Sequence, residues 1–293
     1  MRQEERLVRY DPGLQIEAYR FRGVVQPFPN HFHEGYMVIF LDRGRRRLTC
    51  GQETAGHPRQ YDLAAGDLVL LNPKEPHGCE PVSADGFDFR TLSIPEEVMT
   101  RAVREVTGNP ASPPLRFDTL VDYRSELVPL LRELHQLILK EDRDFRKEEL
   151  FLLLVERWLD KGPAVSSAGE EMAKSDNMGW EEPLEKVCAY LEERYAEPVA
   201  LEELSAVAGF NKYALIRAFT SRKGITPYAY LTAVRVGEVK KQLERGASPL
   251  EAALASGFAD QSHLSKVFKR LIGLTPGQYR AIFRQPGEAR HEG

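Results

Sequence analysis

The chain has 293 residues, about twice the length of a typical domain, and its 42% hydrophobic and 29% charged residues suffice for folded cores, so we expect two domains. The net charge of −4 is uneven, because residues 209–285 carry thirteen Lys and Arg against four Asp and Glu, a charge of +9 that leaves −13 elsewhere. This asymmetry fits either a polyanion partner for the last third or a solvated basic face.

The sequence lacks the features of a membrane-spanning or secreted chain. Its longest apolar runs, Met37 to Leu41 and Phe151 to Val155, are too short to cross a bilayer, and its first residues form no hydrophobic signal region. The three cysteines share no close spacing, which argues against a disulfide framework and against a cysteine-built zinc site. We expect a cytoplasmic protein with no membrane partner.

Residues from about 15 to 95 have the pattern of an all-β domain. Short β-rich runs are separated by Gly, Pro, Asp and Asn, and no helical period lies between them. This spacing predicts a sandwich or a small barrel. The expected strands are Val24-Val25, Tyr36 to Leu41, Arg46 to Cys50, Leu68 to Leu71 and Phe87 to Ile94.

From about residue 120 the apolar period becomes helical. The leucines between 130 and 138 follow one helix face, and Pro129 fits only the first turn of that helix. A second helix, near Lys147 to Lys161, has an apolar surface wider than one core stripe needs. This helical pair is predicted either to form a homodimer interface or to cover the β domain within one chain.

Residues 161–180 are small and polar without a period, which indicates a linker. Everything from Pro183 to Arg284 has helical patterning. We therefore divide the chain into an effector-binding and dimerisation domain at 1–160, a linker at 161–180 and a helical domain at 181–286.

The helical domain contains an internal repeat. Gly209-Phe210 recurs as Gly257-Phe258, and Gly224-Ile225-Thr226-Pro227 recurs as Gly273-Leu274-Thr275-Pro276. In each copy a short helix ends at a glycine, and a capping residue, Asn211 or Asp260 in the two copies, opens a second helix. Two copies are too few for a solenoid, so the pattern predicts a duplicated helix-turn-helix.

The outward faces of the two second helices are rich in hydrogen-bond donors and lack carboxylates after the cap. A helix that enters the major groove of DNA needs such a face, whereas an ordinary bundle mixes Glu and Lys there. The predicted DNA-contacting residues are Lys212, Tyr213, Ile216, Arg217 and Thr220 in the first copy, and Gln261, Ser262, His263, Ser265, Lys266 and Lys269 in the second.

A long helix from Pro227 to about Arg245 joins the two copies. Its nineteen residues span about 28 Å, so both second helices could reach major-groove segments that lie about 34 Å apart on one face of the duplex. If the spacing falls short, a bend in the DNA would be required.

The last hundred residues resemble the DNA-binding domain of the AraC/XylS family of bacterial transcriptional regulators. The resemblance rests on GFNKYALIRAF from Gly209, GFADQSHLSKVF from Gly257 and GLTPGQYR from Gly273. It implies that the positions of Tyr213, Ile216 and Arg217, and of Gln261, Ser262, Ser265 and Lys266, face DNA, and that RNA polymerase is a further partner.

Residues 15 to 95 resemble a cupin, the ligand-binding domain common in that family. His31 and His33 alternate with period two and can share one strand face, and His77 joins them if its segment pairs nearby. We predict that His31, His33, Tyr36 and His77 line the mouth of an effector site. The alternative to a ligand-binding role is that the histidines are plain structural residues.

Three imidazoles would also suit a metal ion. The carboxylate of metal-dependent cupin enzymes is missing, however, because Met37 and Val38 occupy its region, and Glu34 is expected on the opposite face. We therefore expect an α+β two-domain protein with an N-terminal cupin-like β-barrel, a helical pair and an all-α double helix-turn-helix. The expected function is a DNA-binding regulator controlled by a small-molecule effector, with no enzyme activity, metal or cofactor. The alternative is a metal-dependent cupin enzyme fused to a DNA-binding domain.

Overall fold

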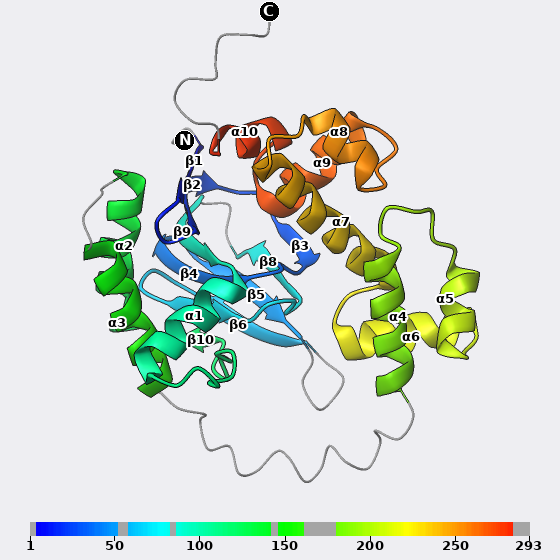
Figure 1. Cartoon of the computed structure of the whole chain (residues 1–293), viewed down its shortest axis with the longest axis horizontal. Helices are drawn as coiled ribbons and strands as arrows, with labels where there is room; N and C mark the ends of the chain where they lie inside the picture. Colours follow the sequence, from blue (N-terminus) through cyan, green and yellow to red (C-terminus); the bar gives the residue numbers. More distant parts are fainter. Residues whose placement is uncertain (1–3, 52–57, 83–85, 142–145, 161–179, 284–293) are drawn as a thin grey trace, which may run out of the picture.

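In the computed structural model, an N-terminal β domain with three helices is followed by a C-terminal helical domain (Figure 1). The structure describes residues 4–51, 58–82, 86–141, 146–160 and 180–283. The predicted α+β two-domain fold is confirmed. The predicted linker, apart from Trp180, lies outside the described residues. None of the helices in the described ranges is long and apolar enough to span a bilayer.

The β domain consists of two antiparallel sheets. The larger sheet has the strand order β1-β2-β9-β4-β7-β10, and the smaller has the order β3-β8-β5-β6. The structure has strands at the predicted 46–50, 68–71 and 87–94, and the strand predicted at 36–41 continues to Arg43. Of the predicted Val24-Val25, only Val24 lies in a strand, and further strands have a weaker pattern. The strands are β1 (Glu5–Asp11), β2 (Ile16–Val24), β3 (Phe28–His31), β4 (Tyr36–Arg43), β5 (Arg46–Cys50), β6 (Arg59–Leu63), β7 (Leu68–Leu71), β8 (His77–Pro81), β9 (Phe87–Ile94) and β10 (Val121–Asp122).

Alternation along the strands of the larger sheet separates two apolar layers. On β4, Met37 and Leu41 point into the space between the two sheets, whereas Val38 and Phe40 point toward the helices. On β9, Phe89 points into the same inner space and Leu92 toward the helices. The larger sheet is therefore buried on both faces, which explains its nearly continuous apolar runs.

Three helices pack against the outer face of the larger sheet: α1 (Glu96–Thr107), α2 (Val128–Leu139) and α3 (Arg146–Asp160). The predicted helical pair corresponds to α2 and α3, and Pro129 lies in the first turn of α2 as expected. The helix α1 was not predicted. Its Gly108 adopts a left-handed conformation (φ 63°) that ends the helix, and this signal marks the end of α1 in the sequence.

The apolar surface of α3 is largely covered within the chain. Phe151, Leu154 and Val155 are buried against α1, α2 and the sheet, which supports the single-chain alternative for most of this surface. Leu153 stays 37% exposed. In Figure 1, α2 and α3 lie on the opposite side of the β domain from α4–α6.

The helical domain contains the two predicted helix-turn-helix modules, α5–α6 and α8–α9. Asn211 and Asp260 cap α6 and α9 by accepting hydrogen bonds from the backbone N–H groups of Ala214 and His263, and the helices end at left-handed Gly224 and Gly273. The helices are α4 (Glu181–Glu193), α5 (Leu201–Ala208), α6 (Lys212–Lys223), α7 (Pro227–Glu244), α8 (Pro249–Ala255), α9 (Gln261–Ile272) and α10 (Pro276–Ala281).

The two modules have different relations to the β domain. The core of the first module, around Leu215 and Phe219, continues into α4 and the start of α7 and touches the β domain through Phe32. The core of the second module, which includes Phe268, belongs to the same apolar cluster as the interior of the β domain. The second module and the β domain therefore share one core.

His135 on α2 is a buried titratable group between the helices and the larger sheet. Its side chain has no exposed surface, and its Nε2 donates a hydrogen bond of 2.8 Å to the carbonyl oxygen of Tyr19. Burial lowers the pKa of His135 from 6.5 to about 4. Below pH 6.5 the unfolded chain therefore binds a proton that the folded chain still excludes.

We expect this proton to lower the free energy of unfolding as pH falls from about 6.5 toward 4. A His135→Gln variant keeps a donor for the Tyr19 carbonyl but does not titrate. Between pH 7 and 5 the native chain should lose about 2 kcal/mol more stability than the variant, measured by urea denaturation. Parallel stability profiles for the two proteins would contradict this prediction. The other histidines titrate in both proteins, so the difference isolates His135.

Candidate DNA-binding surface and ligand cavity

The predicted contact residues of the second module lie on the outward face of α9. Leu264, Val267 and Phe268 bury the opposite face of this helix, as the period of the sequence requires. The side chain of Ser265 is half-buried. The exposed residues of the predicted set are Gln261, Ser262, His263, Lys266 and Lys269.

The outward face of α9 is cationic and rich in donors. The carboxylate of Asp260 at its amino end is engaged in the cap, 2.7 Å from the backbone nitrogen of His263. No other carboxylate lies on α9 itself. The amino end of the helix can therefore face base edges while Lys266 and Lys269 face phosphates.

The first module presents a smaller exposed set on α6. Lys212 and Arg217 are exposed and Ile216 is half-buried. Lys212 forms an ion pair with Glu202 of α5. The position of the Tyr213 side chain lies outside what the structure describes.

Thr220 differs from the sequence prediction. Its side chain is half-buried, and its hydroxyl oxygen is buried without a hydrogen-bond partner among the described residues. The residue lies two turns from the amino end of α6 and directly follows the fully buried Phe219. In this arrangement the Thr220 hydroxyl is not part of the exposed surface.

The two modules are connected by α7, whose eighteen residues span about 27 Å. This length agrees with the one expected from the sequence. The two second helices, α6 and α9, thus lie on either side of α7 in one continuous helical domain.

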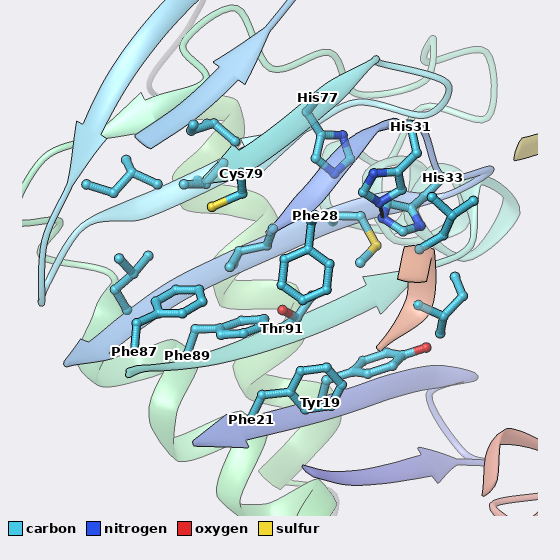
Figure 2. A pocket seen from close by; sticks show the side chains of 18 of the residues that line it. Tyr19, Phe21, Phe28, His31, His33, His77, Cys79, Phe87, Phe89 and Thr91 are labelled. Atoms are coloured by element: carbon cyan, nitrogen blue, oxygen red, sulfur yellow. Dashed lines mark hydrogen bonds between the residues drawn. The ribbon is translucent and has the colours of Figure 1, made fainter. Parts of the chain in front are cut away.

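A cavity of about 90 Å³ lies between the two sheets of the β domain. Its walls are mostly aliphatic and aromatic, and both sheets contribute (Figure 2). The helical domain closes it with Leu271 and Ile272 from the end of α9 and with Lys240 from α7. The wall residues of the sheets include Tyr19, Phe21, Phe28, Met37, Leu48, Leu63, Phe87 and Phe89.

Three of the four predicted effector residues meet at one end of this cavity (Figure 2). His31 on β3 and His77 on β8 are directly paired across the antiparallel strands, and His33 follows two residues after His31. The ring centroids lie 4.6 Å apart for His31 and His77, and 4.7 Å apart for His31 and His33.

The environment of these histidines favours neutral imidazoles. Burial lowers the pKa of His31 to about 4 and that of His77 to about 3, and it holds the pKa of His33 well below its usual value. Lys240 adds a positive charge near His33 that lowers the same pKa further.

Tyr36 does not belong to this group, and its prediction as an effector residue is wrong for this cavity. The side chain alternates with that of Met37 and points to the helix-covered face of β4, where it is 1% exposed. Its hydroxyl donates a hydrogen bond to the carbonyl oxygen of Leu115. The residue is part of the core between the sheet and its helices.

A second, more polar cavity of about 410 Å³ lies between the β domain and α7. It shares His31, His33, Lys240, Leu271 and Ile272 with the apolar cavity, so these residues stand at the boundary of the two spaces. An apolar cavity thus adjoins a polar one.

Glu17 on β2 ties the two domains together beside this boundary. It is 7% exposed and accepts hydrogen bonds from the hydroxyls of Tyr19 and Tyr279 and, at 3.2 Å, from Lys240 Nζ. The Tyr279 hydroxyl also lies 2.6 Å from a carboxylate oxygen of Glu244, so its one proton can go to either carboxylate. Sequence reasoning missed Glu17 and Lys240 because the two are 223 positions apart and neither has a local pattern.

The comparisons with known proteins agree with this architecture. Residues 13–155 match the AraC-like ligand binding domain family, and residues 204–282 match a helix-turn-helix domain family. A Bacillus subtilis (strain 168) protein described as the uncharacterized HTH-type transcriptional regulator YbfI is 42% identical over 264 residues, which cover 90% of this chain and 91% of that protein.

Among solved structures, the apo form of a point variant of ToxT from Vibrio cholerae strain SCE256 has a similar fold. The TM-score is 0.54 with 16% identity, and the match covers 92% of this chain and 98% of ToxT. Wild-type ToxT with a bound unsaturated fatty acid gives a TM-score of 0.53 with 16% identity, over 96% of this chain and 98% of ToxT. With its ligand-binding and helix-turn-helix domains, the chain belongs to the AraC family of transcriptional regulators.

Proposed function

We propose that this regulator binds specific DNA through the outward faces of α6 and α9, and that a small molecule in the cavity between the sheets controls this binding. The observation that carries the proposal is the position of α9. Its amino-terminal half exposes the predicted DNA-contacting residues, while Leu271 and Ile272 at its end close the cavity. One helix therefore touches both candidate sites.

The proposed contact residues on α6 and α9 differ in the part of DNA that each can contact. Arg217 on α6 and Gln261 on α9 are exposed, long enough to reach base edges, and can form bidentate hydrogen bonds with guanine and adenine, respectively. Lys269 lies further from the amino end of α9 and suits a phosphate contact. Ile216 offers no hydrogen bond and would touch a thymine methyl group.

Replacing Arg217 or Gln261 by alanine should weaken binding to the specific operator by roughly 1–3 kcal/mol each, with little change on random DNA. Replacing Lys269 by alanine should instead weaken binding to every duplex. It should also reduce the slope of the logarithm of the binding constant against the logarithm of the salt concentration by about one. Fluorescence anisotropy titrations with operator and random duplexes at several salt concentrations measure both quantities. Equal losses on operator and random DNA for Arg217→Ala would show that this side chain does not read bases.

The position of α9 suggests how a ligand acts. A molecule in the cavity contacts Leu271 and Ile272 directly. Its affinity therefore depends on the position of the second module relative to the β domain. A ligand that binds one placement of α9 better than another shifts the population of the two, by as much as its affinities differ. The spacing between α6 and α9, and with it the affinity for DNA, changes accordingly.

The cavity walls indicate the chemical class of the effector. The interior takes an apolar group, and the polar boundary with Lys240 suits an anionic or hydrogen-bond-accepting end. ToxT, whose fold is similar, has been solved with an unsaturated fatty acid bound. We therefore propose an amphipathic effector with its acceptor end at Lys240.

Further partners follow from the family and from the exposed surfaces. The side of α3 around Leu153 remains available for a homodimer contact. RNA polymerase is the expected partner of a DNA-bound regulator of this family. We place the protein in the cytoplasm with the DNA it binds, propose no membrane partner, and assign no catalytic step to the cavity.

A further inference from the structure

We propose that His31, His33 and His77 bind one divalent transition-metal ion, such as Zn²⁺, at the boundary between the two cavities. The sequence lacks the carboxylate ligand of metal-dependent cupin enzymes and therefore predicts a cavity without a metal ion. The geometry of the three histidine side chains points instead to a metal site. This inference goes beyond the proposed function and does not depend on DNA binding.

The three side chains are already gathered as ligands. Their candidate ligand atoms all lie within 4.8 Å of one another, and the Nε2 atoms of His31 and His33 are 3.1 Å apart. Imidazole nitrogens bound at 2.0–2.1 Å to a tetrahedral ion lie about 3.3 Å from each other. Since His31 carries its proton on Nδ1, His33 donates from Nε2 to His31 Nε2 in the absence of an ion. Coordination therefore requires small rotations of the rings and a shift of the His33 proton from Nε2 to Nδ1.

The backbone fixes which ring nitrogens are free. Nδ1 of His31 is 2.7 Å from the carbonyl oxygen of Pro29, and Nδ1 of His77 is 3.0 Å from that of Glu75. A carbonyl only accepts hydrogen bonds, so each Nδ1 carries the proton and each neutral ring presents an Nε2 lone pair. Metal-binding histidines are typically oriented by a hydrogen bond of this kind from the other ring nitrogen.

Strand pairing makes the arrangement rigid. His31 and His77 are direct cross-strand partners on β3 and β8, and both are at most 5% exposed. His33 is half-buried and also lines the polar cavity, which gives an ion a route to the site. A preformed set of two rigid ligands and one accessible ligand is suited to reversible binding.

The ligand set indicates the class of ion. Three imidazoles suit zinc, nickel or iron, whereas calcium and magnesium prefer oxygen ligands. Within the part of the chain that the structure describes, the group contains these three histidines and no carboxylate. At least one coordination position would thus remain for water or for a donor atom of an effector. Glu17, whose oxygen lies 3.2 Å from Nζ of Lys240, offsets part of the positive charge near the three imidazoles.

The test uses the full chain after treatment with a chelator and dialysis. Co²⁺ is titrated as a probe, because its visible absorption reports the ligand geometry, and bound zinc is counted by elemental analysis after equilibrium dialysis. We expect one ion per chain, and at least about a 100-fold loss of affinity in His33→Ala, since even changes to residues behind the ligands cost 10–100-fold. His31→Gln, which keeps a polar side chain of similar length, should show the same loss.

His135→Gln is the matched control, because His135 lies on α2 and its ring packs against Phe40 on the helix-covered face of the larger sheet. This variant should bind the metal ion like the native chain. Far-UV circular dichroism and thermal melting in chelator establish that each variant is folded. Binding that is unchanged in both His33→Ala and His31→Gln would overturn the proposal, as would the absence of saturable Co²⁺ binding by the native chain. Neither result would bear on the DNA-binding function.

Discussion

Phe268→Ala should lower the free energy of unfolding by about 3–5 kcal/mol and abolish DNA binding. Phe268 has no exposed surface, and its ring packs edge-on against Tyr279 with 5.6 Å between centroids. The residue lies in the apolar cluster shared by the second module and the β domain. The cavity left by the missing ring should therefore weaken both parts in one transition.

The internal repeat supplies a matched variant. Phe219 occupies the corresponding position in the first module and is equally buried, but its cluster is separate from the interior of the β domain. Phe219→Ala should destabilise the first module and leave the β-domain transition in place. Leu254 is 58% exposed on α8, so Leu254→Ala is the surface control. It should change the free energy of unfolding by less than about 0.5 kcal/mol.

Urea denaturation followed by circular dichroism and by tryptophan fluorescence, to which Trp158 in the β domain contributes, measures these three variants. Gel-shift titration measures their DNA binding. If Phe268→Ala cost less than about 1 kcal/mol, or if it left the β-domain transition unchanged, the shared core would be refuted.

Glu17→Ala should lower the free energy of unfolding by about 2–4 kcal/mol and loosen the contact between the domains. The variant removes the carboxylate that accepts from Tyr19, Tyr279 and Lys240. The Lys240 side chain is only 20% exposed and would lose its partner, whereas the Tyr279 hydroxyl can still donate its proton to Glu244. The cost therefore falls mainly on a poorly solvated ammonium group.

Glu5→Ala is the control for this prediction. Glu5 also pairs with an arginine, Arg20, at 2.6 Å, but its side chain is 46% exposed, so the loss should stay below about 1 kcal/mol. Denaturation gives the energies, and small-angle scattering gives the radius of gyration. An unchanged radius and a stability loss equal to that of Glu5→Ala would show that Glu17 does not hold the domains together.

The helix-turn-helix modules could be predicted from the sequence because their signals are local. Asn211 and Asp260 cap their helices through bonds to residues three positions away, and Gly224 and Gly273 end the helices within one turn. The period of apolar residues on α9 then defines its outward face. None of this depends on distant parts of the chain.

The ligand cavity could be predicted only in part. His31 and His33 do meet, but not on one strand face as predicted, because β3 ends at His31. The same run suggested Tyr36, which lies on β4 and faces the helices. The position of His77 depends on the pairing of β3 with β8, and no short-range pattern specifies that pairing. Leu271 and Ile272 follow the core period of their own module, which conceals their contact with the cavity.

The core that unites the second module with the β domain limits how such regulators can be recombined. A β domain transplanted without the end of α9 would expose the aromatic lining around Phe89, and a helical domain released alone would expose Leu271 and Ile272 to water. Chimaeras that exchange β domains at the linker would thus bring together a β domain and an α9 whose apolar surfaces do not fit each other. A functional exchange would transfer Leu271 and Ile272 of α9 together with the β domain. The ligand specificity would then be inherited together with the cavity-facing residues of a helix that also contacts DNA.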